Sequence, residues 1–242
     1  MPYTVLGTKI DCADVSSAKR EIENRITHGT RTAMFTPNLL MIGKAARAKE
    51  ENILNRGNFN IADGSGVYLA LRARKTKNAE RLAGIDLARY ALELAARQGL
   101  RVYLLGGKRG VAERAADKLC REIGGLNVCG THHGYFDTTL GSDEFKRVIA
   151  DIKNRRADVL AVCLGYPKQE QFIVDAYDLL DGVQLFMALG GSLDVWSGEV
   201  RRAPARAQSL HLEWLWRALH QPQRLADACS LPAYFIKALL LP

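Results

Sequence analysis

The sequence predicts an α/β protein with a mainly parallel sheet, flanking helices and a C-terminal helical appendage. Short apolar runs alternate with helix-like segments of ten or more residues. Strands joined by such long crossovers run parallel and are covered by helices. Two of the runs, Val159–Leu164 and Val183–Leu189, are almost continuously hydrophobic. That composition is typical of strands buried on both faces.

The expected elements alternate between helix and strand, except that two helices follow one another at residues 65–74 and 85–98. The first helix, residues 15–27, has helical spacing of its apolar residues, and a strand follows it. Strands are expected at Arg31–Phe35, Phe59–Ala62, Val102–Leu105, Leu126–Cys129, Val159–Leu164 and Val183–Leu189. Further helices are expected at residues 39–54, 65–74, 85–98, 110–123, 143–155 and 168–180.

A domain boundary is expected near residues 198–204, where Ser197-Gly198 and Arg201-Arg202-Ala203-Pro204 interrupt the alternation. Residues 1–198 would then form the core and residues 199–242 the appendage. The appendage is expected to be rich in helix, with breaks at Pro222 and Pro232.

Composition indicates a soluble globular protein, because 48% of the 242 residues are hydrophobic and 25% are charged. No stretch approaches the roughly 20 apolar residues of a membrane span, and no signal peptide is evident. The five cysteines form no CxxC pair, which favours a reducing cytoplasm over a disulfide framework.

Half of the net charge of +8 lies in residues 201–242, where six basic residues face two acidic ones. A local basic surplus suits phosphate groups, an anionic membrane surface or nucleic acid. An ordinary solvated helix face is the alternative.

The expected helix at 205–219 also places Leu210 and Trp214 opposite the apolar face formed by Leu212, Leu215, Trp216 and Leu219. Spare apolar surface beside positive charge suits a lipid headgroup layer, and a sandwiched helix is the alternative.

Three polar motifs each follow an expected strand and precede an expected helix: Thr36-Pro37-Asn38, Ala62–Gly66 and Gly165–Glu170. In an open parallel sheet this is the carboxyl edge, where ligands bind. A carboxylate, amides and glycine turns gathered at one edge indicate an enzyme site.

Asp63 is the candidate general base. Its place between an apolar run and two glycines would push the carboxylate outward, and apolar walls would raise its pKa. Capping the next helix is the competing role. Thr36 and Asn38 can bond sugar hydroxyls or hold a neighbouring carboxylate, while Asn38 can also serve as a helix cap.

Gln169 offers a donor and an acceptor near a helix start, unless it is simply an exposed amide. Asp194, after the glycine turn at 190–191, suits ribose hydroxyls but could equally cap or pair with an arginine. The turn at Gly106-Gly107 lies between a strand and a helix, whose first backbone N–H groups can hold a diphosphate. It lacks the GxGxxG and P-loop patterns, so a ligand-free tight turn is the alternative.

No metal-binding constellation appears, and no cofactor is expected. His132-His133 has no matching ligand spacing and suits a surface pair. There is no Asp-x-Asp pair to hold a divalent cation on a nucleotide diphosphate. Arginines and a helix terminus would have to neutralise such a leaving group.

In combination the motifs resemble those of the WecG/TagA/CpsF family of glycosyltransferases, and the match runs in order over about residues 5–240. The elements that carry the resemblance are TPN, ADGSGV, RLAGIDL, YLLGGKRGVAERA, GYF, GYPKQE, ALGGSLDVWSG, RRAP and LEWLWR…QPQR.

The resemblance implies a Rossmann-like core and a metal-independent, inverting enzyme. It implies a cytoplasmic enzyme peripheral on the inner face of the bacterial plasma membrane, acting on a lipid-linked sugar. TagA-like members move N-acetylmannosamine from UDP to undecaprenyl-diphosphate-GlcNAc, which makes the linkage unit of wall teichoic acid. Sister activities transfer N-acetylmannosaminuronate for enterobacterial common antigen, or glucose or galactose for capsule. No residue here decides the donor sugar, and the sequence leaves a homo-oligomer open.

Carried over by motif, Asp63 matches the proposed base, with Thr36 and Asn38 beside it, and Gln169 matches the glutamine of PKQE. Asp194 would lie near the ribose. Arg217 and Arg224 match the functional arginines of the appendage. A basic residue three positions after Arg224 is replaced here by Asp227, so Arg201, Arg202 or Arg206 would take over part of that role.

Two other classes fit less well. A nucleotide- or RNA-binding protein without catalysis would leave the base-like Asp63 unexplained, and the aromatic residues of a single-strand platform are missing, so no nucleic-acid partner is expected. A nicotinamide dehydrogenase would need a different glycine spacing and a following acidic residue.

Overall fold

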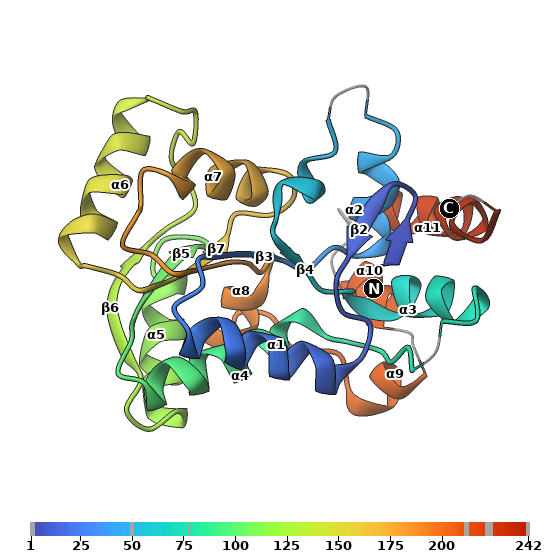
Figure 1. Ribbon diagram of the computed structural model, residues 1–242, viewed down its shortest axis with the longest axis horizontal. Coiled ribbons are helices and arrows are strands. Elements are labelled where there is room, and N and C mark those ends of the chain that lie inside the picture. The colour runs from blue at the N-terminus through green and yellow to red at the C-terminus, as the bar shows by residue number, and fades with distance from the viewer. Residues whose placement is uncertain (1–2, 49–50, 77, 211–212, 221–224, 241–242) are drawn as a thin grey trace.

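A computed structural model describes residues 3–48, 51–76, 78–210, 213–220 and 225–240. Within them, six parallel strands form one sheet in the order β4-β3-β8-β7-β5-β6. The expected α/β class with a parallel sheet, flanking helices and a helical C-terminal segment is confirmed, and the fold is Rossmann-like. Figure 1 shows α6 and α7 on one side of the sheet and α1, α4 and α5 on the other.

The strands of the main sheet lie close to their expected positions: β3 (Thr32–Phe35), β4 (Phe59–Asn60), β5 (Arg101–Gly106), β6 (Asn127–His132), β7 (Val159–Cys163) and β8 (Leu185–Ala188). The helices of the core are α1 (Val15–Thr27), α2 (Leu39–Ala45), α3 (Gly64–Ala73), α4 (Gly84–Arg97), α5 (Val111–Glu122), α6 (Asp143–Asn154), α7 (Lys168–Tyr177) and α8 (Ser192–Ser197). The C-terminal helices are α9 (Ala205–Ser209), α10 (Glu213–His220) and α11 (Leu225–Leu240).

Alternate residues of the inner strands β3, β8, β7 and β5 enter two different hydrophobic cores, as the pleat of a buried strand requires. In β5, Val102 and Leu104 join the core beneath α4 and α5, whereas Tyr103 and Leu105 join the one beneath α6 and α7. These four side chains are fully buried. Burial on both faces explains why the sequences of β5, β7 and β8 are almost entirely hydrophobic.

The structure adds an N-terminal hairpin that the sequence does not reveal. Strands β1 (Tyr3–Val5) and β2 (Thr8–Ile10) pair antiparallel across Leu6-Gly7. Both turn residues have positive φ, +48° and +77°. Asn-Gly is the usual signal for such a turn, and a leucine in the first position conceals it.

Two expected helices and one expected helix break differ from what is observed. Residues 39–54 are not one helix: α2 ends at Ala45, because residues 46–48 are exposed and offer no apolar face, and a short 3-10 helix, η1 (Ile53–Arg56), follows. The segment 205–219 divides into α9 and α10. The break expected at Pro232 is wrong, since α11 continues through it. Pro222 lies outside the described residues.

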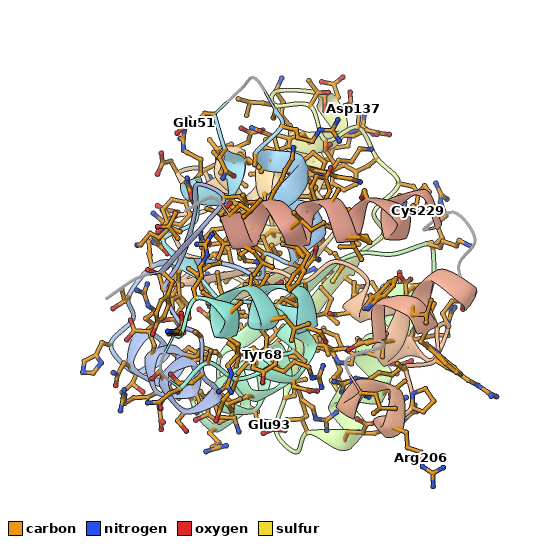
Figure 2. The ribbon with its side chains drawn as sticks, turned by 90° about the vertical axis from the view of Figure 1, so that its right-hand side faces the viewer. Glu51, Tyr68, Glu93, Asp137, Arg206 and Cys229 are labelled. Atoms are coloured by element: carbon orange, nitrogen blue, oxygen red, sulfur yellow. The ribbon has the colours of Figure 1, made fainter. Side chains whose placement is uncertain are left out.

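Helix α11 continues past its proline because it is docked on the core. It packs against α2 and α3, as Figures 1 and 2 show. Tyr234 is 5% exposed and Ala238 is fully buried. A Cβ atom on Gly43 of α2 would lie 2.2 Å from Cγ of Tyr234, so the ring rests on the helix where a side chain is missing. This contact offsets the loss of the backbone hydrogen bond that Pro232, which has no N–H, cannot donate.

Candidate active site

The carboxyl ends of the strands bring the sequence-predicted motifs to one edge of the sheet. Asp63 follows β4, Thr36 follows β3 and Gly190 follows β8 in neighbouring positions, with Gly165 after β7 next along the edge. Gly106, which ends β5, lies four strand spacings from β4, or roughly 19 Å. The edge therefore spans from the candidate base to the candidate diphosphate turn.

Asp63 occupies the cap position of α3 but makes no side-chain cap bond to that helix. Its Oδ1 instead accepts a hydrogen bond of 2.7 Å from the backbone N–H of Gly84, the first residue of α4. Its own N–H donates to the carbonyl of Pro37 at 3.0 Å. The carboxylate is therefore held by a segment 21 residues away rather than used as a local helix cap.

Thr36 shares the contact with Gly84. Its hydroxyl donates to the buried carbonyl of Ala188 at 2.9 Å. A Cβ atom on Gly84 would lie 3.0 Å from Cβ and Cγ2 of Thr36, so α4 approaches β3 closely only because residue 84 is glycine. Through Gly84, Thr36 and Asp63 lie against the same helix start. Asn38 stands apart from this contact, since its Oδ1 caps α2 by accepting from the N–H of Met41 at 3.1 Å.

Gln169 is buried, so the exposed-amide interpretation is wrong. It is 2% exposed, and its Oε1 accepts from the N–H of Gly190 at 2.8 Å. Its Nε2 donates to Oε1 of Glu170 at 2.8 Å. Burial raises the pKa of Glu170 to about 7. Sequence reasoning did not single out Glu170, although an acidic residue beside a motif glutamine was visible.

The glycine turn after β5 has a packing reason of its own. Gly106 has φ +138°, and a Cβ atom there would lie 2.3 Å from the carbonyl oxygen of Cys163. Gly107 has φ +69°, and its carbonyl accepts from the N–H of Gly134 at 2.8 Å. No side chain caps α5, whose cap residue is Gly110. Asp194 lies in the first turn of α8, the helix that follows the turn at Gly190.

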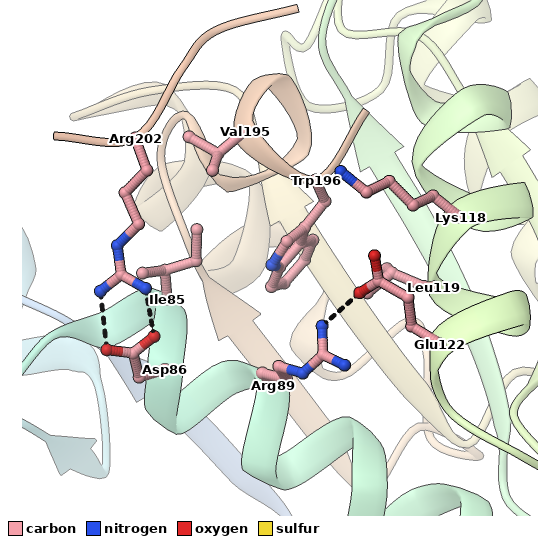
Figure 3. Close-up of a pocket in the computed structure, with 9 residues that line it drawn as sticks. All are labelled: Ile85, Asp86, Arg89, Lys118, Leu119, Glu122, Val195, Trp196 and Arg202. Atoms are coloured by element: carbon pink, nitrogen blue, oxygen red, sulfur yellow. Dashed lines mark hydrogen bonds and ion pairs between the residues drawn. The ribbon is translucent and has the colours of Figure 1, made fainter. Parts of the chain in front are cut away.

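A charge network that the sequence did not reveal lies beside Asp63. Arg202 binds Asp86 through two hydrogen bonds of 2.6 and 2.7 Å, which Figure 3 shows. The hydrogen bond to Asp86 raises the pKa of Arg202, and the charge of Asp63 adds to that rise. Arg81 pairs with Glu213 of α10 at 3.3 Å, and both side chains are less than one-fifth exposed. Because it is paired with Asp86, the side chain of Arg202 lies half-buried against the core and does not extend into solvent.

The other appendage candidates lie partly outside what the structure describes. Arg201 and Arg206 are exposed, and Figure 2 shows the side chain of Arg206 extending outward from α9. Trp214 is 41% exposed. Leu215 is exposed as well, contrary to its expected packing on the core. Arg224 lies outside the described residues, and Arg217 belongs to α10 but its side chain is outside them.

Two surface hollows lie on the described part of the chain. One of about 170 Å³ lies between α4, α5 and α8 and includes Trp196 and Arg202, as Figure 3 shows. The other, of about 290 Å³, includes Arg109, His132 and His133. Burial lowers the pKa of His133.

Among the described residues no group of three or more potential ligands is arranged for a metal ion. None of the described helices has the length and hydrophobicity needed to cross a membrane.

The family described as "Glycosyl transferase WecG/TagA/CpsF family" matches residues 3–241, nearly the whole chain.

Proposed function

Because this chain belongs to the WecG/TagA/CpsF family of glycosyl transferases, we propose that it moves N-acetylmannosamine from UDP to undecaprenyl-diphosphate-GlcNAc with inversion and without a metal. The protein is a hexosyltransferase that acts on a sugar donor and an acceptor. The proposed donor and acceptor are those of the TagA-like members of the family.

The observation that carries the proposal is the way Asp63 is held. A carboxylate at a helix start usually caps that helix, and this one does not. Instead it accepts from the N–H of Gly84 at the sheet edge where ligands bind in parallel α/β folds. One hydrogen bond to a carboxylate oxygen fixes its orientation, as a general base requires.

In the proposed reaction Asp63 takes the proton from the acceptor hydroxyl. The hydroxyl oxygen forms a bond to the anomeric carbon of the donor sugar, on the face opposite UDP. The bond from that carbon to the diphosphate oxygen breaks, and its electron pair leaves with UDP. Asp63 then releases its proton to solvent. Thr36 and Asn38 flank Pro37, whose carbonyl accepts from the N–H of Asp63, and Gln169 holds the turn at Gly190.

The departing diphosphate needs positive partners. We assign it to Arg217 and Arg224 of the appendage. The turn at Gly106-Gly107 and the start of α5, roughly 19 Å along the edge from β4, would hold the part of the nucleotide that lies farther from the base. Asp194 would bond the ribose. The exposed Arg201, Arg206 and Trp214 would contact the membrane surface that holds the lipid acceptor.

The test is a UDP-release assay with a short-lipid GlcNAc-diphosphate acceptor and UDP-N-acetylmannosamine, with and without EDTA. Asp63→Asn keeps an oxygen for the Gly84 N–H but removes the base, so turnover should fall by about 100-fold or more. Asp14→Asn is the matched control, because Asp14 also starts a helix and does cap it.

Acceptor-dependent release that survives EDTA and is lost in Asp63→Asn supports the proposal. Turnover by Asp63→Asn at the wild-type rate would remove Asp63 as the base. Release with UDP-N-acetylmannosaminuronate, UDP-glucose or UDP-galactose alone would replace the proposed donor and leave the glycosyltransferase assignment in place.

A further inference from the structure

Glu170 is a buried carboxylate with an unusual set of partners. It is fully buried in the first turn of α7. Its Oε1 accepts from Nε2 of Gln169 at 2.8 Å, and its Oε2 has no hydrogen-bond partner among the described residues. A buried carboxylate with one unpaired oxygen is costly to the fold. A cap for α7 does not explain it, because no side-chain cap bond is present.

The contacts of Gln169 explain what Glu170 does there. The backbone N–H of Gly190 can only donate, so it requires the oxygen of the Gln169 amide. The ionised carboxylate of Glu170 can only accept, and its neutral form still accepts at the carbonyl oxygen, so Oε1 pairs with the amide NH₂. Together the two partners select one of the two amide orientations. With the amide reversed, its NH₂ would face the N–H of Gly190.

We propose that Glu170 is a positioning residue for glycosyl transfer, which fixes the Gln169 amide and thereby the turn at Gly190-Gly191. The inference rests on the function proposed above for the same site. On the other side of this turn, Thr36 holds the carbonyl of Ala188. The chain that leaves β8 is thus held at the carbonyl of Ala188 and at the N–H of Gly190, on either side of Leu189. This stretch leads directly to α8, the helix that carries Asp194.

The experiment uses the full chain with four variants. Glu170→Leu removes the acceptor and leaves the NH₂ of Gln169 buried without a partner. Glu170→Gln offers a carbonyl oxygen in its place and keeps the bond. Gln169→Glu sets two carboxylates against each other in a buried site. The double variant Gln169→Glu/Glu170→Gln rebuilds the pair with the donor on the other residue.

Two readouts separate positioning from folding. The first is kcat at saturating donor, divided by the fraction of protein that binds UDP. It should fall by roughly 10- to 100-fold in Glu170→Leu and in Gln169→Glu, and return to within about threefold of wild type in the double variant. The second is hydrogen exchange in a peptide covering residues 188–193, where the Gly190 amide should exchange faster in these two single variants and recover in the double.

Hydrogen exchange needs no substrate, so it tests the link from Glu170 to Gly190 even if the wild type transfers no N-acetylmannosamine. Absence of transfer by the wild type with every donor would defeat the proposed function and leave this second readout standing. Unchanged exchange at Gly190 in Glu170→Leu would overturn the inference. So would faster exchange accompanied by wild-type kcat, or a double variant that is no better than Gln169→Glu.

Discussion

Replacing Glu170 by glutamine should change how the stability of this protein depends on pH. Burial raises the pKa of Glu170 from its ordinary value near 4.5 to about 7, so the folded state binds the proton more tightly than the unfolded chain. Its contribution is therefore most favourable below pH 4.5 and is lost as the pH rises toward 7. A difference of about 2.5 between the two pKa values corresponds to about 3.4 kcal/mol, of which about 2.5 kcal/mol is lost between pH 5 and pH 8.

The amide introduced by Glu170→Gln cannot titrate, so the free energy of unfolding of this variant minus that of wild type should rise by about 2.5 kcal/mol from pH 5 to pH 8. Tyr166 also faces this carboxylate, and the charge of Glu170 adds to the rise that burial causes in the pKa of Tyr166. Urea unfolding at pH 5, 6, 7 and 8 and constant ionic strength measures the difference.

Glu113→Gln is the matched control, because Glu113 is the third residue of α5 as Glu170 is of α7, but it is exposed. Any effect of the helix dipole appears in both variants, and only Glu170→Gln should show the slope. A difference between Glu170→Gln and wild type that does not vary with pH, or that falls as the pH rises, would refute the argument that this carboxyl is buried and ionises reluctantly.

Two further substitutions test contacts near the site. Gly43→Ala should displace the Tyr234 ring, lower the free energy of unfolding by about 1–3 kcal/mol and speed hydrogen exchange in residues 231–240. Gly124→Ala is the control, because a Cβ atom there meets no atom within 4 Å, and unchanged exchange in Gly43→Ala would show that α11 does not depend on this contact. Thr36→Val should leave the buried carbonyl of Ala188 without its donor, cost about 1–3 kcal/mol in urea unfolding and lower kcat, and full activity would separate Thr36 from the reaction.

The sheet could be predicted from the sequence because the inner strands, such as β7 and β8, are hydrophobic on both faces and the crossovers are long enough to contain a helix. The same pattern placed the polar motifs at the carboxyl edge, and the structure confirms that location. The order of the strands was not predictable, because it depends on packing between segments that lie far apart in the chain.

Side-chain roles were harder to predict because local rules compete with distant partners. Asp63 and Asn38 both begin a helix, and cap propensity treats them alike. Asn38 does cap its helix, whereas Asp63 is held by the N–H of Gly84. For Gln169 the sequence left a functional amide and an exposed amide open, and the hydrogen bond from the N–H of Gly190 decides between them. For Asp63 and Gln169 the deciding partner belongs to another element.

The segment 81–86 joins the appendage to the proposed base. Its first residue pairs with Glu213 of α10, and its last pairs with Arg202 at the start of the appendage. Between them, the N–H of Gly84 holds the carboxylate of Asp63. A shift of the appendage that breaks the two ion pairs therefore acts on a segment only a few residues long that also orients the base. If the appendage docks on the membrane as proposed, the position of the base and the docking of the lipid acceptor are coupled through this segment.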